Sequence, residues 1–267
     1  MAAGTWALRT GLDLDTVNVH LEALEAAGLL GITEEDGRAT VWLPERVAGL
    51  PVSGEWEAVP DADWHAQWKA RLEPVEVGSL RIVPPWKARP HGEGSATDGG
   101  IDLIIEPAQA FGTGHHETTA GCLAALCELD LVLASVLDVG TGTGVLAIAA
   151  ARLGAATVVA VDTDPLAVAA ATDNASANDV RVDVRLGSVH EVHGRFDLVL
   201  ANLDTATLSS LAPALVARLA ARGALIASGV AVERRSEAVA AFAAAGLPVW
   251  DRAGGEWVVL VGSATGR

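Results

Sequence analysis

The sequence predicts an α/β protein in which a seven-stranded, mainly parallel sheet follows a smaller N-terminal α+β domain. After residue 115, short apolar segments typical of strands alternate with Ala-rich segments typical of helices, as in a parallel sheet covered on both faces. Six of the eight Trp residues lie before residue 90, so the two ends differ in composition. Residues 89–100 between them are rich in turn-forming residues. We therefore expect domains at 1–88 and 101–267, joined by a linker at 89–100.

The N-terminal segment combines a helical pattern with a hairpin pattern. Apolar residues recur every three to four positions over 13–27, which predicts a helix. Residues 29–33 and 39–43 flank an Asp-Gly pair, which predicts a β-hairpin. We expect a second helix over 61–72 and a strand over 80–83.

The C-terminal segment contains seven predicted strands with helices between them. The last two strands are separated by too few residues for a crossover helix, so we expect them to form an antiparallel hairpin. The strands are expected at 135–139, 158–161, 182–186, 196–201, 224–228, 247–250 and 257–261.

Charge and composition exclude several classes of partner. The chain has 18 basic and 34 acidic residues and a net charge of −16, which repels phosphate backbones and attracts cationic partners. We therefore expect no direct binding to nucleic acid. No apolar run reaches the roughly 18 residues of a membrane helix, and the N-terminus does not resemble a signal peptide. These features favour a cytoplasmic monomer with no membrane partner.

Two groups of potential metal ligands do not predict a metal site. Cys122 and Cys127 are too few and too awkwardly spaced for a metal knuckle, so we expect buried thiols. Neighbouring residues of a helix face different directions, so His115 and His116 are a poor pair of ligands for one ion. We expect no metal site.

A glycine-rich turn after the first of the seven strands predicts a cofactor site. Asp138 precedes Gly140, Gly142 and Gly144, and such glycines allow a ligand to approach the backbone closely. Part of this run also fits a dinucleotide pattern, but the earlier glycine and the acidic residue favour S-adenosylmethionine. Asp162 ends the next strand, where its carboxylate can accept hydrogen bonds from ribose hydroxyls.

Two further segments are candidates for the site. Asn202 ends the fourth strand at the carboxyl edge of the sheet, where open parallel sheets bind ligands, and it is either a ligand for an amine and the cofactor or a helix cap. Asp204 fits the cap better. Residues 106–119 place glycines beside an aromatic residue, which suggests a loop over a bound ligand.

Taken together, four motifs closely resemble the family of bacterial ribosomal protein L11 methyltransferases (PrmA). The specific motif is AFGTGHHETT at 110–119, and the others are LDVGTGTG at 137–144, VDTDP at 161–165 and ANL at 201–203. The resemblance extends from about residue 54 to the end of the chain.

The resemblance implies a Rossmann-like class I methyltransferase domain joined to a small substrate-recognition domain. By the same match Thr119, Gly140, Asp162 and Asn202 contact S-adenosylmethionine, with Phe111 close to it. The implied activity is methyl transfer to lysine amines of ribosomal protein L11, with an N-terminal amine as an additional candidate. Asn202 is the candidate for orienting the amine and the cofactor, and no general base is assigned.

The first 50 residues depart from the family pattern. Members begin with a strand of a ferredoxin-like unit, and we do not find that strand in the sequence. A helix followed by an Asp-Gly hairpin is also typical of a DNA-binding winged helix. Residues 1–68 contain three basic and twelve acidic residues, however, which disfavours phosphate binding and suits a cationic protein.

Two other functions remain open at this stage. One is methylation of another protein or of a small-molecule amine. The other is a regulator that binds S-adenosylmethionine as a signal and DNA through its N-terminal unit.

Overall fold

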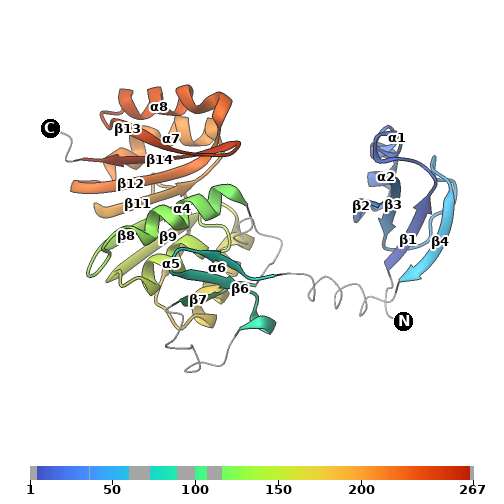
Figure 1. Cartoon of the computed structure of the whole chain (residues 1–267), viewed down its shortest axis with the longest axis horizontal. Helices are drawn as coiled ribbons and strands as arrows, with labels where there is room; N and C mark the ends of the chain where they lie inside the picture. Colours follow the sequence, from blue (N-terminus) through green and yellow to red (C-terminus); the bar gives the residue numbers. More distant parts are fainter. Residues whose placement is uncertain (1–4, 36, 60–72, 89–99, 107–115, 265–267) are drawn as a thin grey trace. The chain divides into compact units, whose positions relative to one another are not determined.

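The computed structural model describes residues 5–35, 37–59, 73–88, 100–106 and 116–264, which fall into two compact units (Figure 1). The first unit ends at Glu73 and the second begins at Pro74. This division lies before the boundary predicted at residue 88, because residues 75–83 form strands that pair within the second unit. The predicted helix at 61–72 and nearly all of the linker lie outside the described residues.

The first unit is a four-stranded antiparallel sheet in the order β2-β3-β1-β4. The predicted hairpin is confirmed, since β2 and β3 pair from Gly31↔Trp42 to Glu35↔Arg38. The predicted helix at 13–27 is divided into two short helices. Residues 16–19 are Thr, Val, Asn and Val, which are weak helix formers, and the first helix ends among them, at Asn18. The elements are β1 (Thr5–Thr10), α1 (Leu14–Asn18), α2 (Leu21–Ala26), β2 (Gly31–Glu35), β3 (Arg38–Leu43) and β4 (Gly54–Val59).

The expectation that the first strand is missing is wrong. Strand β1 occupies the interior of the sheet and pairs with both β3 and β4. Its alternation is hard to recognise in the sequence because Ala7 and Leu8, which are adjacent, are both buried. The strand order is that of a ferredoxin-like unit, but residues 44–53, all of them described, contain no helix between β3 and β4. The unit begins with a strand that lies inside a four-stranded sheet, so it is not the winged helix that we considered.

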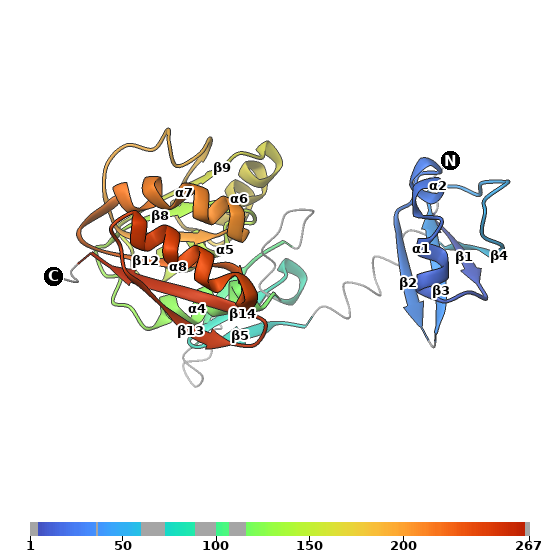
Figure 2. The same cartoon turned by 90° about the horizontal axis from the view of Figure 1, so that it is seen from above.

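The second unit contains the predicted seven-stranded sheet, in the order β10-β9-β8-β11-β12-β14-β13. Strands β10, β9, β8, β11 and β12 are parallel, and β14 lies antiparallel between β12 and β13. The predicted terminal hairpin is therefore confirmed (Figure 2). The strands are β8 (Ser135–Val139), β9 (Thr157–Asp162), β10 (Asp183–Leu186), β11 (Phe196–Asn202), β12 (Leu219–Ala231), β13 (Val249–Gly254) and β14 (Trp257–Ser263).

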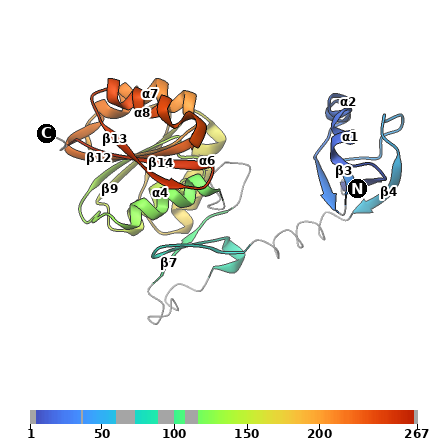
Figure 3. The same ribbon diagram turned by 45° about the horizontal axis from the view of Figure 1, so that its top comes forward.

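Helices cover both faces of this sheet (Figure 3). Helices α4 (Glu117–Cys127), α5 (Val145–Arg152) and α6 (Pro165–Ala177) pack on one face, and α7 (Thr205–Ala217) and α8 (Arg235–Ala244) pack on the other. Two apolar clusters result, one on each face. The parallel strands therefore end together at one edge of the sheet, which is the usual place for a ligand.

A small three-stranded sheet precedes the large one. It consists of β5 (Val75–Val77), β6 (Leu80–Val83) and β7 (Ile101–Ile104), with β6 and β7 parallel. Leu80, Ile82 and Leu103 join the same apolar cluster as α4 and α5. The strand predicted at 80–83 is confirmed, whereas β7 was not predicted. Within the described ranges, no helix is both long and apolar enough to cross a bilayer.

Candidate functional site

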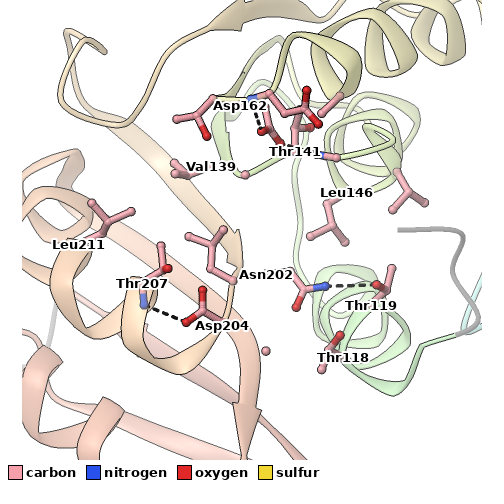
Figure 4. A pocket seen from close by; sticks show the side chains of 18 of the residues that line it. Thr118, Thr119, Val139, Thr141, Leu146, Asp162, Asn202, Asp204, Thr207 and Leu211 are labelled. Carbon is pink, nitrogen blue, oxygen red and sulfur yellow. Dashed lines mark hydrogen bonds between the residues drawn. The ribbon is translucent and has the colours of Figure 1, made fainter. Parts of the chain in front are cut away.

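A cavity of about 570 Å³ lies at the carboxyl edge of the large sheet (Figure 4). Its volume falls in the range of small-molecule sites. The walls are formed by the ends of β8, β9 and β11 and the first turn of α4. The residues that decide its chemistry are Thr118, Thr119, Gly140, Gly142, Asp162, Asp164, Ser188, Asn202, Asp204 and Trp257.

The glycine-rich turn presents its backbone to this cavity. Gly140 and Gly142 have φ angles of 72° and 54°, which side chains rarely adopt. A Cβ atom at Gly140 would lie 2.3 Å from Cδ2 of Leu203, so no other residue fits there without displacing that side chain. A ligand can therefore lie directly against the peptide groups of this turn.

Asp162 lies where the sequence predicted, at the end of β9 and on the cavity wall. Its Oδ2 accepts a hydrogen bond from the backbone N–H of Gly142 at 2.9 Å, and its Oδ1 accepts one from the N–H of Asp164 at 3.0 Å. Each carboxylate oxygen can accept more than one hydrogen bond, so hydroxyl donors of a ligand can still be bound. Asp162 thus fixes the turn and offers acceptors to the cavity.

The side chains of Asn202 and Thr119 are in direct contact at the cavity (Figure 4). The Asn202 Nδ2 donates to Oγ1 of Thr119 at 3.1 Å. The Oδ1 of Asn202 is buried and has no hydrogen-bond partner in the described part of the chain. Asp204, by contrast, caps α7 by accepting from the N–H groups of Ala206 and Thr207. Asn202 is therefore not the cap, and its Oδ1 is a buried acceptor without a partner at the cavity wall.

Two of the predicted cofactor residues lie behind the turn rather than on the cavity wall. Asp138 is only 1% exposed and accepts a hydrogen bond from Oγ1 of Thr141 at 2.7 Å. Burial raises its pKa to about 6. Gly144 begins α5 with a φ of 82°, and its Cβ position lies 3.0 Å from Cβ of Ala171. Both residues support the turn from behind, while Phe111 lies outside the described residues.

The cavity also includes residues that the sequence reasoning missed. Gly187 and Ser188 follow β10, and their position after a predicted strand was a usable signal. Trp257 carries no such signal, because it begins β14, the antiparallel strand whose amino end lies beside the carboxyl ends of its neighbours. The Trp257 ring lies edge-on to the ring of His116, with 5.1 Å between centroids. His116 caps α4, accepting from the N–H of Thr118 at 3.3 Å.

Comparison with known proteins identifies the family. The family model described as "Ribosomal protein L11 methyltransferase (PrmA)" matches residues 15–265. The chain belongs to this family. A ribosomal protein L11 methyltransferase of Deinococcus radiodurans is 40% identical over 227 residues, which cover 81% of each chain. That of Thermus thermophilus is 37% identical over 258 residues, covering 96% of this chain and 98% of the relative.

A solved structure of the family supports the same assignment. The ribosomal protein L11 methylase of Lactobacillus delbrueckii subsp. bulgaricus matches with a TM-score of 0.65 and 30% identity, over 72% of this chain and 98% of the other. The chain is thus a class I methyltransferase, and its methyl donor is S-adenosylmethionine. The predicted family, fold class and cofactor are confirmed. The cavity fits this donor, since a glycine-rich backbone, the Asp162 carboxylate and the Asn202 side chain all line it.

Proposed function

We propose that this methyltransferase acts on lysine side-chain amines of ribosomal protein L11, with an N-terminal amine as an additional candidate. The names of the relatives support the protein substrate. The observation that carries the amine is the buried, unpartnered Oδ1 of Asn202 on the cavity wall. An amide oxygen accepts a hydrogen bond from an amine N–H, whereas a thiol S–H is only a weak donor.

The residues around the cavity have two roles: some bind the methyl donor, and others orient the amine that accepts the methyl group. Asp162 would bind the ribose hydroxyls of S-adenosylmethionine, and the turn at Gly140 and Gly142 would lie against the donor. When bound, the donor supplies an electrophilic methyl group on a sulfonium. Thr119 holds the Asn202 side chain, so the two residues together orient the groups that react. Phe111 remains a proposed donor neighbour from the family resemblance.

The substrate amine must be neutral when it attacks the methyl group, because the protonated amine has no free lone pair. A lysine of ordinary pKa near 10.4 costs about 4 to 5 kcal/mol to deprotonate at pH 7. The carboxylates of Asp162, Asp164 and Asp204 on the cavity wall all accept backbone N–H groups, and we assign none of them as a general base. Asn202 can direct the lone pair of a neutral amine by accepting one of its hydrogens. Positioning is therefore the main contribution that we assign to the enzyme.

The N-terminal unit is the proposed docking module for the substrate. Its excess of acidic residues over 1–68 complements a basic ribosomal protein and disfavours nucleic acid. A ribosomal substrate also agrees with the cytoplasmic location and the monomeric state that we propose. The seven-stranded unit would then supply the donor site and the N-terminal unit the affinity for protein.

Methyl transfer with defined acceptors tests the proposal. Purified L11 should accept labelled methyl groups, and mass spectrometry should place them on lysine or on the N-terminal amine. L11 with its amines acetylated beforehand is the control and should accept none. Duplex DNA and free amino acids are offered in parallel. Label on the free amino acids, with L11 unmodified, would favour a small-molecule substrate, whereas no label on any acceptor together with binding of the DNA would favour the regulator.

A further inference from the structure

Two asparagines, one inside α6 and one at its C-cap, make a set of hydrogen bonds that neither the motifs nor the cavity explain. Asn174 and Asn178 lie one helical turn apart and are 3% and 1% exposed. Asparagine inside a helix lowers its stability, and burial of an amide is costly unless each polar atom is bonded. Their bonds must therefore contribute something that an apolar residue would not.

Asn178 binds the small sheet. Its Oδ1 accepts from the N–H of Ile104 at 2.8 Å, and its Nδ2 donates to the carbonyl of the same residue at 2.6 Å and to the backbone carbonyl of Asn174 at 2.8 Å. The amide thus occupies the place of a neighbouring strand along β7. No described atom of the glycine-rich turn bonds to the Asn178 side chain.

Asn174 joins two different parts of the chain. Its Oδ1 accepts from the N–H of Glu106 at 2.9 Å, and its Nδ2 donates to the carbonyl of Thr143 at 2.9 Å. The orientation of the amide is fixed because the first partner can only donate and the second can only accept. Thr143 is fully buried within the glycine-rich turn, and Glu106 follows β7.

The Thr143 contact adds a second side-chain bond to the turn. Asp162 holds the N–H of Gly142 from the end of β9, and Asn174 of α6 holds the carbonyl of the following residue, Thr143. Helix α6 also lies against the turn at Ala171, next to Gly144. The turn is therefore bonded by side chains from two elements.

We propose that Asn174 is a positioning residue for the methyl donor, acting through the carbonyl of Thr143 to hold the glycine-rich turn in its ligand-binding conformation. Loss of that bond frees the turn, and part of the donor's binding energy must then restore it. Asn178 caps the same helix, is similarly buried and bonds the end of β7, but its side chain has no bond to the turn. The inference concerns donor binding and does not depend on which amine is methylated.

Three variants of the full-length protein separate these contributions. Asn174→Leu removes both bonds of the amide, and Asn178→Leu is the matched control. Asn174→Asp retains an acceptor for Glu106 but, when ionised, has no donor for Thr143. Binding of S-adenosylhomocysteine is measured by calorimetry, and exchange of backbone amides over 139–146 is measured without ligand by mass spectrometry.

We expect both Asn174 variants to weaken binding about tenfold or more and to speed exchange over 139–146. Asn178→Leu should lower the melting temperature, stay within about twofold of the parent in affinity and speed exchange only near 101–106. Lowering the pH returns a proton, and so a donor, to the carboxyl group of Asn174→Asp. Its affinity relative to the parent at each pH should therefore recover toward pH 5.

Two results would overturn the proposal. One is parent-like affinity and exchange in Asn174→Asp at pH 8. The other is an equal loss of affinity in Asn178→Leu, which would mean that the effect follows general destabilisation of α6. If Asn174→Leu does not fold, Asn174→Asp and its pH dependence still decide the question.

Discussion

Asn202 has one bonded and one free amide atom, and this asymmetry predicts how its removal affects the reaction. Asn202→Ala should lower kcat on the order of 100-fold, because the amine loses its orienting acceptor, while the fold stays intact. Thr119→Val keeps the shape of the partner but removes its hydroxyl, and should lower kcat less. Steady-state kinetics and circular dichroism check both. A parent-like kcat and KM in Asn202→Ala would leave the residue without a role in the reaction.

Asp162 serves both the turn and the cavity, so its removal should act on donor affinity. Asp162→Ala should weaken S-adenosylmethionine binding by about 1 to 3 kcal/mol, the cost of leaving polar groups unpaired. Asp183→Ala, on the exposed neighbouring strand β10, is the control and should bind normally. Calorimetry measures both, and unchanged affinity in Asp162→Ala would refute the donor placement.

Asp138 predicts a pH dependence of stability. Burial raises its pKa from 3.8 to about 6, so the folded protein holds this proton to higher pH than the unfolded chain does. The stabilising effect of the proton is present at low pH and is lost as pH rises through about 4 to 6. Two pKa units correspond to roughly 3 kcal/mol.

Asp138→Asn removes that titration. The stability of the variant relative to the parent should therefore rise by up to about this amount between pH 4 and pH 7. Urea unfolding at the two pH values measures the difference, which cancels any constant cost of the altered hydrogen bond. A difference that does not change with pH would show that the carboxyl group titrates normally.

At the scale of elements, Gly144 shows how closely α5 and α6 approach. Gly144→Ala places a Cβ 3.0 Å from Ala171 and adopts a positive φ, whereas Gly194→Ala adopts a φ of 96° with no atom within 4 Å. The second change should cost about 1 to 2 kcal/mol from backbone strain alone, and the first should cost more. Urea unfolding measures the free energy of unfolding of both variants. Equal losses of stability would mean that α5 and α6 can move apart at little cost.

The regular elements were predictable where one signal was dominant. Strand β8 is predicted to the residue, because its apolar run is bounded by the glycine turn that follows. Strand β1 was missed because burial on adjacent residues hides its alternation, and β7 because its bonds go to β6 and to Asn178. Long-range pairing of this kind leaves no local pattern in the sequence.

The site was predictable to a similar extent. Asp162 and Asn202 end strands of a parallel sheet, so their meeting at one edge follows from topology. The support given by Asn174 follows from a contact between α6 and the turn, which spacing alone does not reveal. Asp138 and Gly144 belong to the same motif as the lining glycines, and only the fold separates the two groups.

At the scale of the whole molecule, the two units predict separable functions. A protein beginning at Pro74 should keep donor affinity but lose most methylation of L11, because it retains the large sheet and lacks the acidic unit. A start near residue 98 would instead remove β5 and β6, and so the strand that pairs with β7. Calorimetry and methyl transfer check the two activities. Full-rate methylation by the shortened protein would place substrate recognition in the seven-stranded unit.

Salt provides an independent check on the intact enzyme. Exposed opposite charges attract over only about 8 Å at physiological ionic strength, so the apparent KM for L11 should rise as salt is added. Donor affinity serves as the control and should change less. A KM that is independent of salt would mean that apolar contacts dominate docking.

The position of β14 also has a consequence for how the protein is made. Because β14 inserts between β12 and β13, a nascent chain that has emerged only as far as β13 has a strand without its neighbour and an open edge on β12. The same nascent chain lacks Trp257, one wall of the cavity. The donor site is therefore complete only after β14 has emerged, and until then the unpaired edge of β12 is open to aggregation.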